Sequence, residues 1–195
     1  MQPHNHLALK DEEIIKRIIE NNESQLFEIL YKRYYRRVAD KCNSMLKDKY
    51  LAEESAKDVL SKSFEKLSKF KGQSSFSSWL YSITYNHCID YMRLKKRLHY
   101  PDWNKKHEIP EIIDEADDGF PEVSFAHLTK VLEMIHPEEK ALLLMRYEYN
   151  LPFKQIGTSL RISESAAKMR IKRAKARVLY HFKKIEENNF KTELK

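Results

Sequence analysis

Hydrophobic positions in the first half of the chain recur at intervals of three and four residues, which is the period of an amphipathic helix. The pattern predicts one helix opening behind Asp11, the expected N-cap, and others over residues 24–46, 52–70 and 76–97. A break at 71–75 contains Gly72, and Ser75 is expected to cap the fourth helix. Trp79 is expected in the core. The expected buried face of the fourth helix consists of Phe76, Leu80, Ile83, His87, Tyr91 and Leu94.

A second set of helical patterns begins at Pro137, because proline at the first helical position followed by two acidic residues favours a helix start. That helix is expected to reach about Tyr149. A short helix over 153–160, a turn at 161–163 and a last helix over about 164–184 follow. Small Gly157 falls where the last two helices must approach closely, and Ser163 is expected to cap the last one. A short helix, a tight turn and a longer basic helix together predict a helix-turn-helix.

The interval between the two sets of helices has a different composition. It contains Pro101, Pro110 and Pro121, and residues 107–122 carry seven acidic side chains and no Lys or Arg. Proline, polarity and like-charge repulsion all oppose a packed core. We therefore predict an all-α chain of two small helical domains, residues 1–98 and 123–195, joined by an acidic flexible linker at 99–122.

Composition narrows the class of function. Three glycines in 195 residues argue against Gly-rich phosphate loops and turn-rich β folds, and a formal net charge of +7 suits a polyanionic partner. The two cysteines lack metal-ligand spacing, and no apolar run is long enough for a signal segment or a membrane span. We expect a reduced, cytoplasmic protein without membrane insertion. No catalytic, metal-binding or cofactor-binding motif is present, so we expect no enzyme activity, no metal and no cofactor.

The last predicted helix separates apolar positions from cationic ones. Ala167, Ile171, Ala174 and Val178 form one apolar stripe, and Glu164 is the only acid before Glu186. A solvated lysine-rich surface helix is the alternative, but clustered charge of one sign favours a helix that lies in the major groove of DNA. The six cations assigned to the other face are Lys168, Arg170, Lys172, Arg173, Lys175 and Arg177.

Two separated stretches resemble one family. LPFKQIGTSLRISESAAKMRIKRAKAR at 151–177 is similar to LSYxEIAxxLGISEGTVKSRLxRARxxL, and FSSWLYSITYNHCIDYMRLKKR at 76–97 follows FRAWLYRIARNxxxDYLRRRRR. The first pattern is typical of the C-terminal DNA-binding region of bacterial RNA polymerase sigma factors of the extracytoplasmic-function type, in the sigma-70 family. The second is typical of the N-terminal domain of the same factors. Two matches in the right order, with an unmatched linker between them, are a specific signal.

The resemblance implies a factor that binds core RNA polymerase, recognises promoter DNA as duplex and as melted single strand, and has an anti-sigma factor as a further partner. Arg170 and Arg173 are expected to contact base edges, and the lysines phosphates. The residues expected at the minus-thirty-five element are Ser165, Lys168, Met169, Arg170, Lys172 and Arg173. Those expected at the minus-ten element are Lys71, Gln73, Ser74, Asn86, Arg93 and Lys96.

The helix expected to dock on polymerase departs from the family pattern. Family members usually show DxVQExF, whereas this chain has DVLSKSF at 58–64, so Asp58 is kept and Ser61 and Lys62 replace Gln and Glu. A carboxylate that becomes an ammonium reverses the charge offered to the partner. These three residues are still expected to contact core polymerase. Two alternatives stay open: a stand-alone helix-turn-helix regulator, and a helical adaptor that binds protein only.

Overall fold

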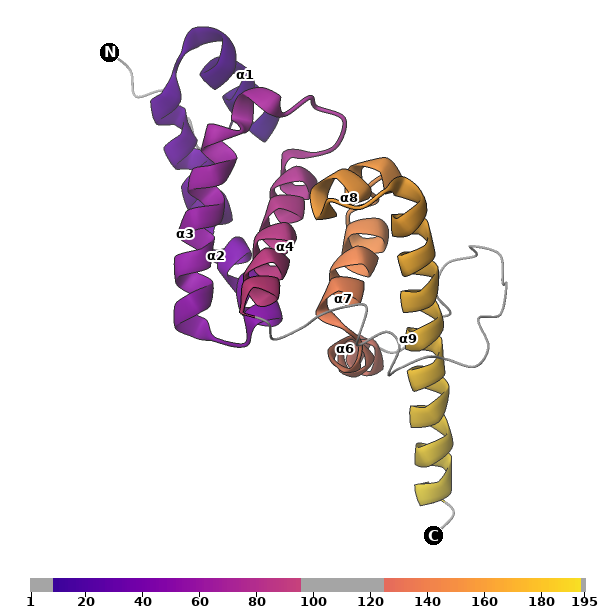
Figure 1. Cartoon of the computed structure of the whole chain (residues 1–195). Coiled ribbons are helices and arrows are strands. Elements are labelled where there is room, and N and C mark those ends of the chain that lie inside the picture. Colours follow the sequence, from indigo (N-terminus) through magenta and orange to yellow (C-terminus); the bar gives the residue numbers. More distant parts are fainter. Residues whose placement is uncertain (1–8, 96–124, 194–195) are drawn as a thin grey trace. The chain divides into compact units, whose positions relative to one another are not determined.

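The computed structural model describes residues 9–95 and 125–193, and the regular structure within these ranges is entirely helical (Figure 1). The chain divides into two compact units after Leu94. The all-α class predicted from the sequence is confirmed. The linker predicted at 99–122 lies outside the described residues and stays a prediction.

The first unit is built around three long helices that contact one another pairwise. Its core contains fully buried Leu30, Val38, Val59, Leu60 and Leu80. In chain order the helices are α1 (Asp11–Asn21), α2 (Phe27–Leu46), α3 (Lys49–Glu65) and α4 (Phe76–Leu94). The shorter helix α1, first in the chain, packs against α2 and against two 3-10 turns, Ser24–Leu26 before α2 and Leu67–Lys69 after α3 (Figure 1).

Local side-chain caps explain where two of these helices begin. The carboxylate of Asp48 accepts from the amide of Leu51 at 3.0 Å, and the hydroxyl of Ser75 accepts from the amide of Ser78 at 3.2 Å. Each bond satisfies an amide of the first turn that lacks a helical partner. The cap predicted at Ser75 is thus confirmed.

The cap predicted at Asp11 is wrong. Lys10 occupies the N-cap position of α1, and Asp11 is the first helical residue. Its carboxylate instead accepts hydrogen bonds from the Arg33 guanidinium and the Tyr34 hydroxyl, both on α2. Asp11 therefore ties α1 to α2, a contact between positions more than 20 residues apart that a local pattern does not contain.

The buried face predicted for α4 is partly wrong. Leu94 is 81% exposed, and Ile83, His87 and Tyr91 are only half-buried. The buried stripe passes instead through Tyr85, Cys88, Ile89 and Met92, together with polar Ser82 and Thr84. The hydroxyls of Ser82 and Thr84 donate to carbonyls of their own helix, at 2.7 and 2.9 Å. These bonds permit the burial of Ser82 and Thr84, and a prediction of the buried face of α4 from hydrophobic positions alone is therefore partly wrong.

The second unit places one long helix against three shorter ones (Figure 1). Two boundaries differ from those predicted: the first helix after Pro137 ends at Leu143 and continues as a π-helical turn over Leu144–Glu148, and the last helix continues to Glu193. The helix that precedes Pro137 was not predicted as an element. The helices are α6 (Phe125–Met134), α7 (Pro137–Leu143), α8 (Phe153–Leu160) and α9 (Glu164–Glu193).

The turn between α8 and α9 has the geometry of a helix-turn-helix. Arg161 ends α8 in the left-handed conformation, with φ 55°, and the hydroxyl of Ser163 accepts from the amide of Ala166 at 3.1 Å. A Cβ at Gly157 would lie 2.8 Å from the carbonyl oxygen of Ile162, closer than real Cβ atoms approach. The close approach predicted at Gly157 and the cap predicted at Ser163 are confirmed.

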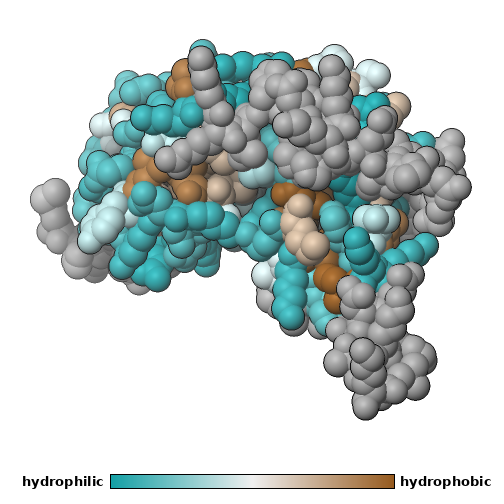
Figure 2. Space-filling view, turned by 60° about the horizontal axis from the view of Figure 1, so that its bottom comes forward, coloured by the Kyte–Doolittle hydropathy of each residue, from teal (hydrophilic) through white to brown (hydrophobic). Residues whose placement is uncertain are grey.

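The face turned forward in Figure 2 is mainly hydrophilic in both units, with small hydrophobic patches between polar residues. None of the described helices combines the length and the apolar character needed to cross a membrane.

Candidate nucleic-acid and polymerase interface

The predicted recognition helix, α9, buries the apolar stripe expected from the sequence. Ala167, Ile171, Ala174 and Val178 are at most 4% exposed, on a helix that packs against α6, α7 and α8. At 100° per residue, five of the six predicted residues fall on an arc about 140° wide on the other side of the helix: Ser165, Lys168, Met169, Lys172 and Arg173. The first three are exposed and the last two half-buried. The structure therefore brings five of the six predicted minus-thirty-five residues together on one arc.

Lys168 is held at the start of this arc. Its ammonium lies 3.1 Å from the Glu164 carboxylate and 5.5 Å from the centre of the Phe153 ring at the start of α8. The guanidinium of Arg146 lies 4.5 Å from the same ring. Two cations near one aromatic ring place positive charge beside the N-terminus of α8, where the helix dipole adds to it.

Arg170 and Arg177 do not belong to this arc. The Arg170 guanidinium donates to the Glu138 carboxylate at 2.9 Å, and Arg177 pairs with Glu139. Arg177 and Glu139 are both buried, so the assignment of Arg177 to an exposed cationic face is wrong. The role of Arg170 in contacting bases stays a prediction, with the ion pair as a competing role. Glu138 and Glu139 were interpreted only as acidic residues at a helix start, and no sequence signal pointed to their partners 32 and 38 residues away.

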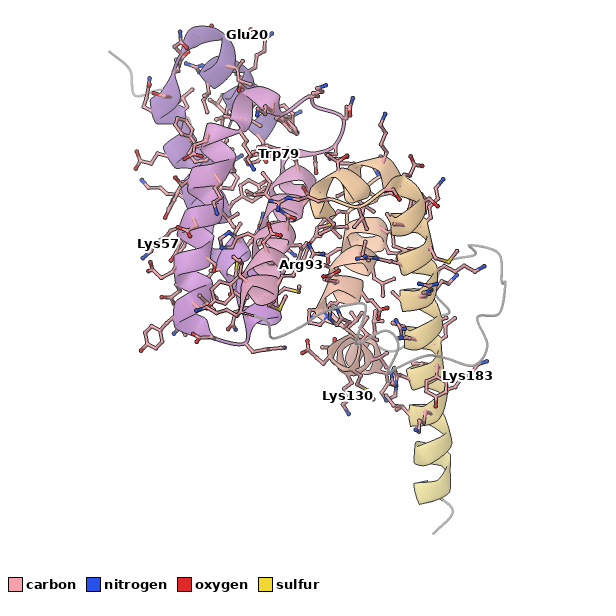
Figure 3. All side chains as sticks on the ribbon, in the orientation of Figure 1. Glu20, Lys57, Trp79, Arg93, Lys130 and Lys183 are labelled. Carbon is pink, nitrogen blue, oxygen red and sulfur yellow. The ribbon has the colours of Figure 1, made fainter. Side chains whose placement is uncertain are left out.

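The residues predicted to contact the minus-ten element lie at two places along α4. Lys71, Gln73 and Ser74 belong to the loop before the helix, where Gly72 adopts φ 65°. Arg93 lies near the other end of α4 (Figure 3), roughly 25 Å away at 1.5 Å per residue. Asn86 lies between them on the helix. Lys96 lies outside the described residues.

Aromatic rings support the loop at the start of α4. The Trp79 ring lies 5.3 Å from the Phe70 ring and 5.7 Å from the Phe76 ring, measured between centroids. Trp79, labelled near the start of α4 in Figure 3, is half-buried and is not a core residue. Phe76 is fully buried beneath it, so the cluster anchors the loop to the core.

The predicted docking residues Asp58, Ser61 and Lys62 are exposed on one side of α3, at spacings of three and four residues. The ammonium of Lys62 lies 3.2 Å from Nδ1 of His87 on α4. Along α4, Asn86 donates to the Asp90 carboxylate at 3.4 Å, and Arg93 lies 3.8 Å from it. The docking residues and two of the minus-ten residues therefore lie on one continuous surface of α3 and α4, linked by His87 and Asp90. From the sequence, His87 was assigned to the core and Asp90 was given no role in the interface, so both linking residues were missed.

The surroundings of His87 favour its neutral form. Burial, together with the Lys62 ammonium, lowers the pKa of the His87 imidazole below its ordinary value, while Asp58 and Asp90 act in the opposite direction. A neutral ring can accept a hydrogen bond from the Lys62 ammonium at Nδ1 only if its own proton is on Nε2. Lys62 is therefore oriented by its neighbour and keeps further N–H groups for a partner.

The two cysteines of the chain lie on α2 and α4. Cys42 and Cys88 are both free and buried, and a hydrogen bond with Cys42 together with burial raises the pKa of the Cys88 thiol far above its usual range. Such a thiol is a poor nucleophile. Across residues 9–95 and 125–193, no three His, Cys, Asp or Glu side chains are grouped so that they could hold a metal ion.

Comparison with known families matches both units. The family model for Sigma-70 region 2 matches residues 30–98, and the model for Sigma-70 region 4 matches residues 127–178. The first match contains the α3–α4 surface, and the second contains the helix-turn-helix. The chain belongs to the sigma-70 family of RNA polymerase sigma factors, in its extracytoplasmic-function type. In this sigma factor, α1 and the part of α9 after Val178 lie outside the matched regions.

Two curated relatives are named as sigma factors, and two solved structures share the fold. The extracytoplasmic-function sigma factor SigX of Bacillus subtilis is 22% identical over 74% of this chain and 77% of its own. The sigma factor YlaC of the same organism is also 22% identical, over 82% and 94%. Among structures, RpoE bound to the anti-sigma factor NepR, from Bartonella quintana, is 19% identical with a TM-score of 0.52, covering 80% of this chain and 96% of that one. CnrH bound to the cytosolic domain of CnrY is 16% identical with a TM-score of 0.54, covering 89% and 97%. These structural likenesses show the fold.

Proposed function

We propose that this sigma factor binds core RNA polymerase, directs it to promoters and helps to melt promoter DNA, without catalysing a reaction itself. The observation that carries the proposal is the ordered pair of regions: a region 2 match over the α3–α4 surface, and a region 4 match over a helix-turn-helix whose second helix carries a cationic arc. A chain with the second feature alone would fit a simple DNA-binding regulator equally well.

The α9 arc contacts the minus-thirty-five element in this proposal. Lys168 and Lys172 supply charge for phosphates, whereas Arg173 has the guanidinium geometry that pairs with guanine in the major groove. Ser165 and exposed Met169 lie between the cations and can contact base edges or thymine methyl groups. Arg170 is retained as a candidate base contact, although its pairing with Glu138 favours another role.

The loop before α4 and the α4 surface contact the minus-ten element. Single-stranded bases are commonly captured by a cationic track beside aromatic and polar side chains. Lys71, Gln73 and Ser74 provide polar groups on the loop supported by Trp79, and Asn86 and Arg93 continue the track along α4. Lys96 belongs to the same proposal on sequence grounds.

Core polymerase docks on the exposed side of α3 that carries Asp58, Ser61 and Lys62. The mixed charge of this surface supports a partner with both signs, since Asp58 and the oriented Lys62 lie one helical turn apart. An anti-sigma factor is the further partner proposed here, because RpoE and CnrH, which share the fold, were solved with NepR and with the cytosolic domain of CnrY.

Run-off transcription with the cognate core polymerase, with and without the full chain, tests the proposal. Promoter-dependent transcripts are expected only when the chain is present. Specific duplex binding without polymerase, and no stimulation of transcription, would favour the stand-alone regulator. Absence of any DNA dependence would favour the protein-only adaptor.

A further inference from the structure

Two consecutive carboxylates at the start of α7 are buried against arginines of α9. Glu138 is 3% exposed and Glu139 is fully buried. Glu138 accepts from Arg170 at 2.9 Å, and Glu139 pairs with Arg177, whose side chain is 4% exposed. Both carboxylates therefore leave water and depend on the guanidinium groups for compensation.

The spacing of the two arginines gives the pairs a geometric consequence. Arg170 and Arg177 are seven residues apart, nearly two helical turns, so they project from the same side of α9. Their partners are adjacent on the first turn of α7. A single contact between two helices would allow one helix to rotate about that contact. Two contacts spaced along the axis of α9 fix both the rotation of α9 and its position along that axis.

Buried ion pairs are a costly way to hold two helices together. Desolvation of both charges offsets most of their attraction, and apolar side chains of similar volume often stabilise a fold equally well. The surrounding interface already has apolar packing from Ala141, Leu142, Ala167, Ile171 and Ala174. The pairs therefore contribute directionality, which apolar contacts lack.

We propose that Glu138 and Glu139 are positioning residues that set the orientation of the recognition helix, and that Arg170 serves this anchor instead of contacting bases. The inference rests on the proposed function of α9 at the minus-thirty-five element. It assigns sequence discrimination to the arc of Ser165, Lys168, Met169, Lys172 and Arg173. The carboxylates influence DNA binding although they have no contact with DNA.

Substitution of each partner separates the two possible roles of Arg170. Binding of Arg170→Met, Glu138→Gln and the double variant to a panel of minus-thirty-five duplexes is measured by fluorescence anisotropy at several salt concentrations. If the pair is an anchor, both single variants lose affinity by a similar factor of roughly tenfold on every duplex, and the double variant loses no more than either. The salt dependence stays parental, because no phosphate contact is removed.

A swapped pair gives a second, independent readout. The variant Glu138→Arg with Arg170→Glu keeps the ion pair but removes any base-contacting cation from position 170. Recovery of affinity and of parental base preference in the swapped variant is expected from the anchor. Circular dichroism of each variant verifies that the helices are intact.

Two results would overturn the inference. In one, Arg170→Met relaxes preference at a single base pair while Glu138→Gln binds as the parent does, which makes Arg170 a base contact. In the other, both single variants bind as the parent does, which leaves no positioning role. Failure of the proposed function is distinct from both, because then the parent and the control Arg173→Ala bind every duplex alike.

Discussion

Gly157 has no side chain at the point where α8 and the turn into α9 are closest. A methyl group there would meet the Ile162 carbonyl oxygen at 2.8 Å, and backbone must move to relieve the clash. We therefore expect Gly157→Ala to lower the free energy of unfolding by about 1–3 kcal/mol. Urea titration measures the change, and Thr158→Ala, at the exposed neighbouring position, is the control, expected to stay within about 0.5 kcal/mol of the parent.

His87 predicts a stability that depends on pH. Because its pKa in the folded chain lies below the ordinary value of 6.5, the unfolded chain binds the proton more readily. The contribution of neutral His87 is fully present above pH 6.5 and is lost as pH falls through the lowered pKa. His87→Gln keeps an acceptor for Lys62 but does not titrate, so its free energy of unfolding should fall less over this range than that of the parent.

Urea titrations at a series of pH values compare the two chains. Lys62→Met is a second control, because removing the Lys62 ammonium takes away one cause of the lowered His87 pKa. In the Lys62→Met background, His87→Gln should therefore change the pH dependence of the free energy of unfolding less than it does in the parent. Superimposable pH profiles for parent and His87→Gln would contradict the lowered pKa of the half-buried His87 imidazole.

At the scale of the helix, α9 offers cations of two kinds to DNA. Loss of a phosphate contact at Lys172 should weaken binding to all sequences alike and reduce the salt slope by about one. Loss of a base contact at Arg173 should cost roughly 1–3 kcal/mol and relax preference at one promoter position. Alanine variants of each, tested on the same duplex panel, distinguish the two outcomes.

Lys183→Ala is the matched control for these variants. Lys183 is exposed on the same helix but lies beyond the region 4 match, as Figure 3 shows along α9. Its loss should leave both affinity for the panel and the salt slope close to parental values. An effect as large as that of Lys172→Ala would mean that nonspecific charge, rather than the arc, accounts for binding.

The exposed side of α3 makes a separate prediction about polymerase. Asp58→Arg reverses charge next to Lys62 and should abolish co-purification with core polymerase while helicity is unchanged. Asp40→Arg is a matched acid-to-arginine change at an exposed position of α2, where the lost pair with Arg36 at 3.1 Å contributes little. Retained association in Asp58→Arg, or equal loss in both variants, would show that this side of α3 is not the docking surface.

At the scale of the whole molecule, we expect two units that fold separately. The sequence between His107 and Glu122 combines prolines with acidic residues, and this composition disfavours a packed core. Limited proteolysis should cut in this interval first and leave two helical fragments, identified by mass spectrometry. Equal resistance along the whole chain would instead indicate that the interval is packed against one of the units.

The features that could be predicted from the sequence depend on interactions between residues that lie close together in the chain. The cap at Ser75, the bounds of α8 and the close approach at Gly157 depend on residues within a few positions of one another. The apolar stripe of α9 was also predictable, because it is continuous along one helix. Family patterns placed the docking residues at exposed positions of α3, and three of the minus-thirty-five residues, Ser165, Lys168 and Met169, at exposed positions of α9.

What could not be predicted depends on contacts distant in sequence. Arg177 has the charge of a surface residue and is buried only because Glu139 meets it 38 positions away. The buried face of α4 is rotated because hydroxyls bonded to their own helix take core positions. α6 was missed, although it packs on α9.

The buried partnership of Glu139 and Arg177 also constrains how this lineage can change. A mutation at either position alone strands a charge in the interior, at a cost of about 3–5 kcal/mol. That cost is a large share of the roughly 5–15 kcal/mol by which a domain is stable. Substitution of either residue alone is therefore expected to be selected against. Among close descendants, the two positions should be inherited together or be replaced together by an apolar couple.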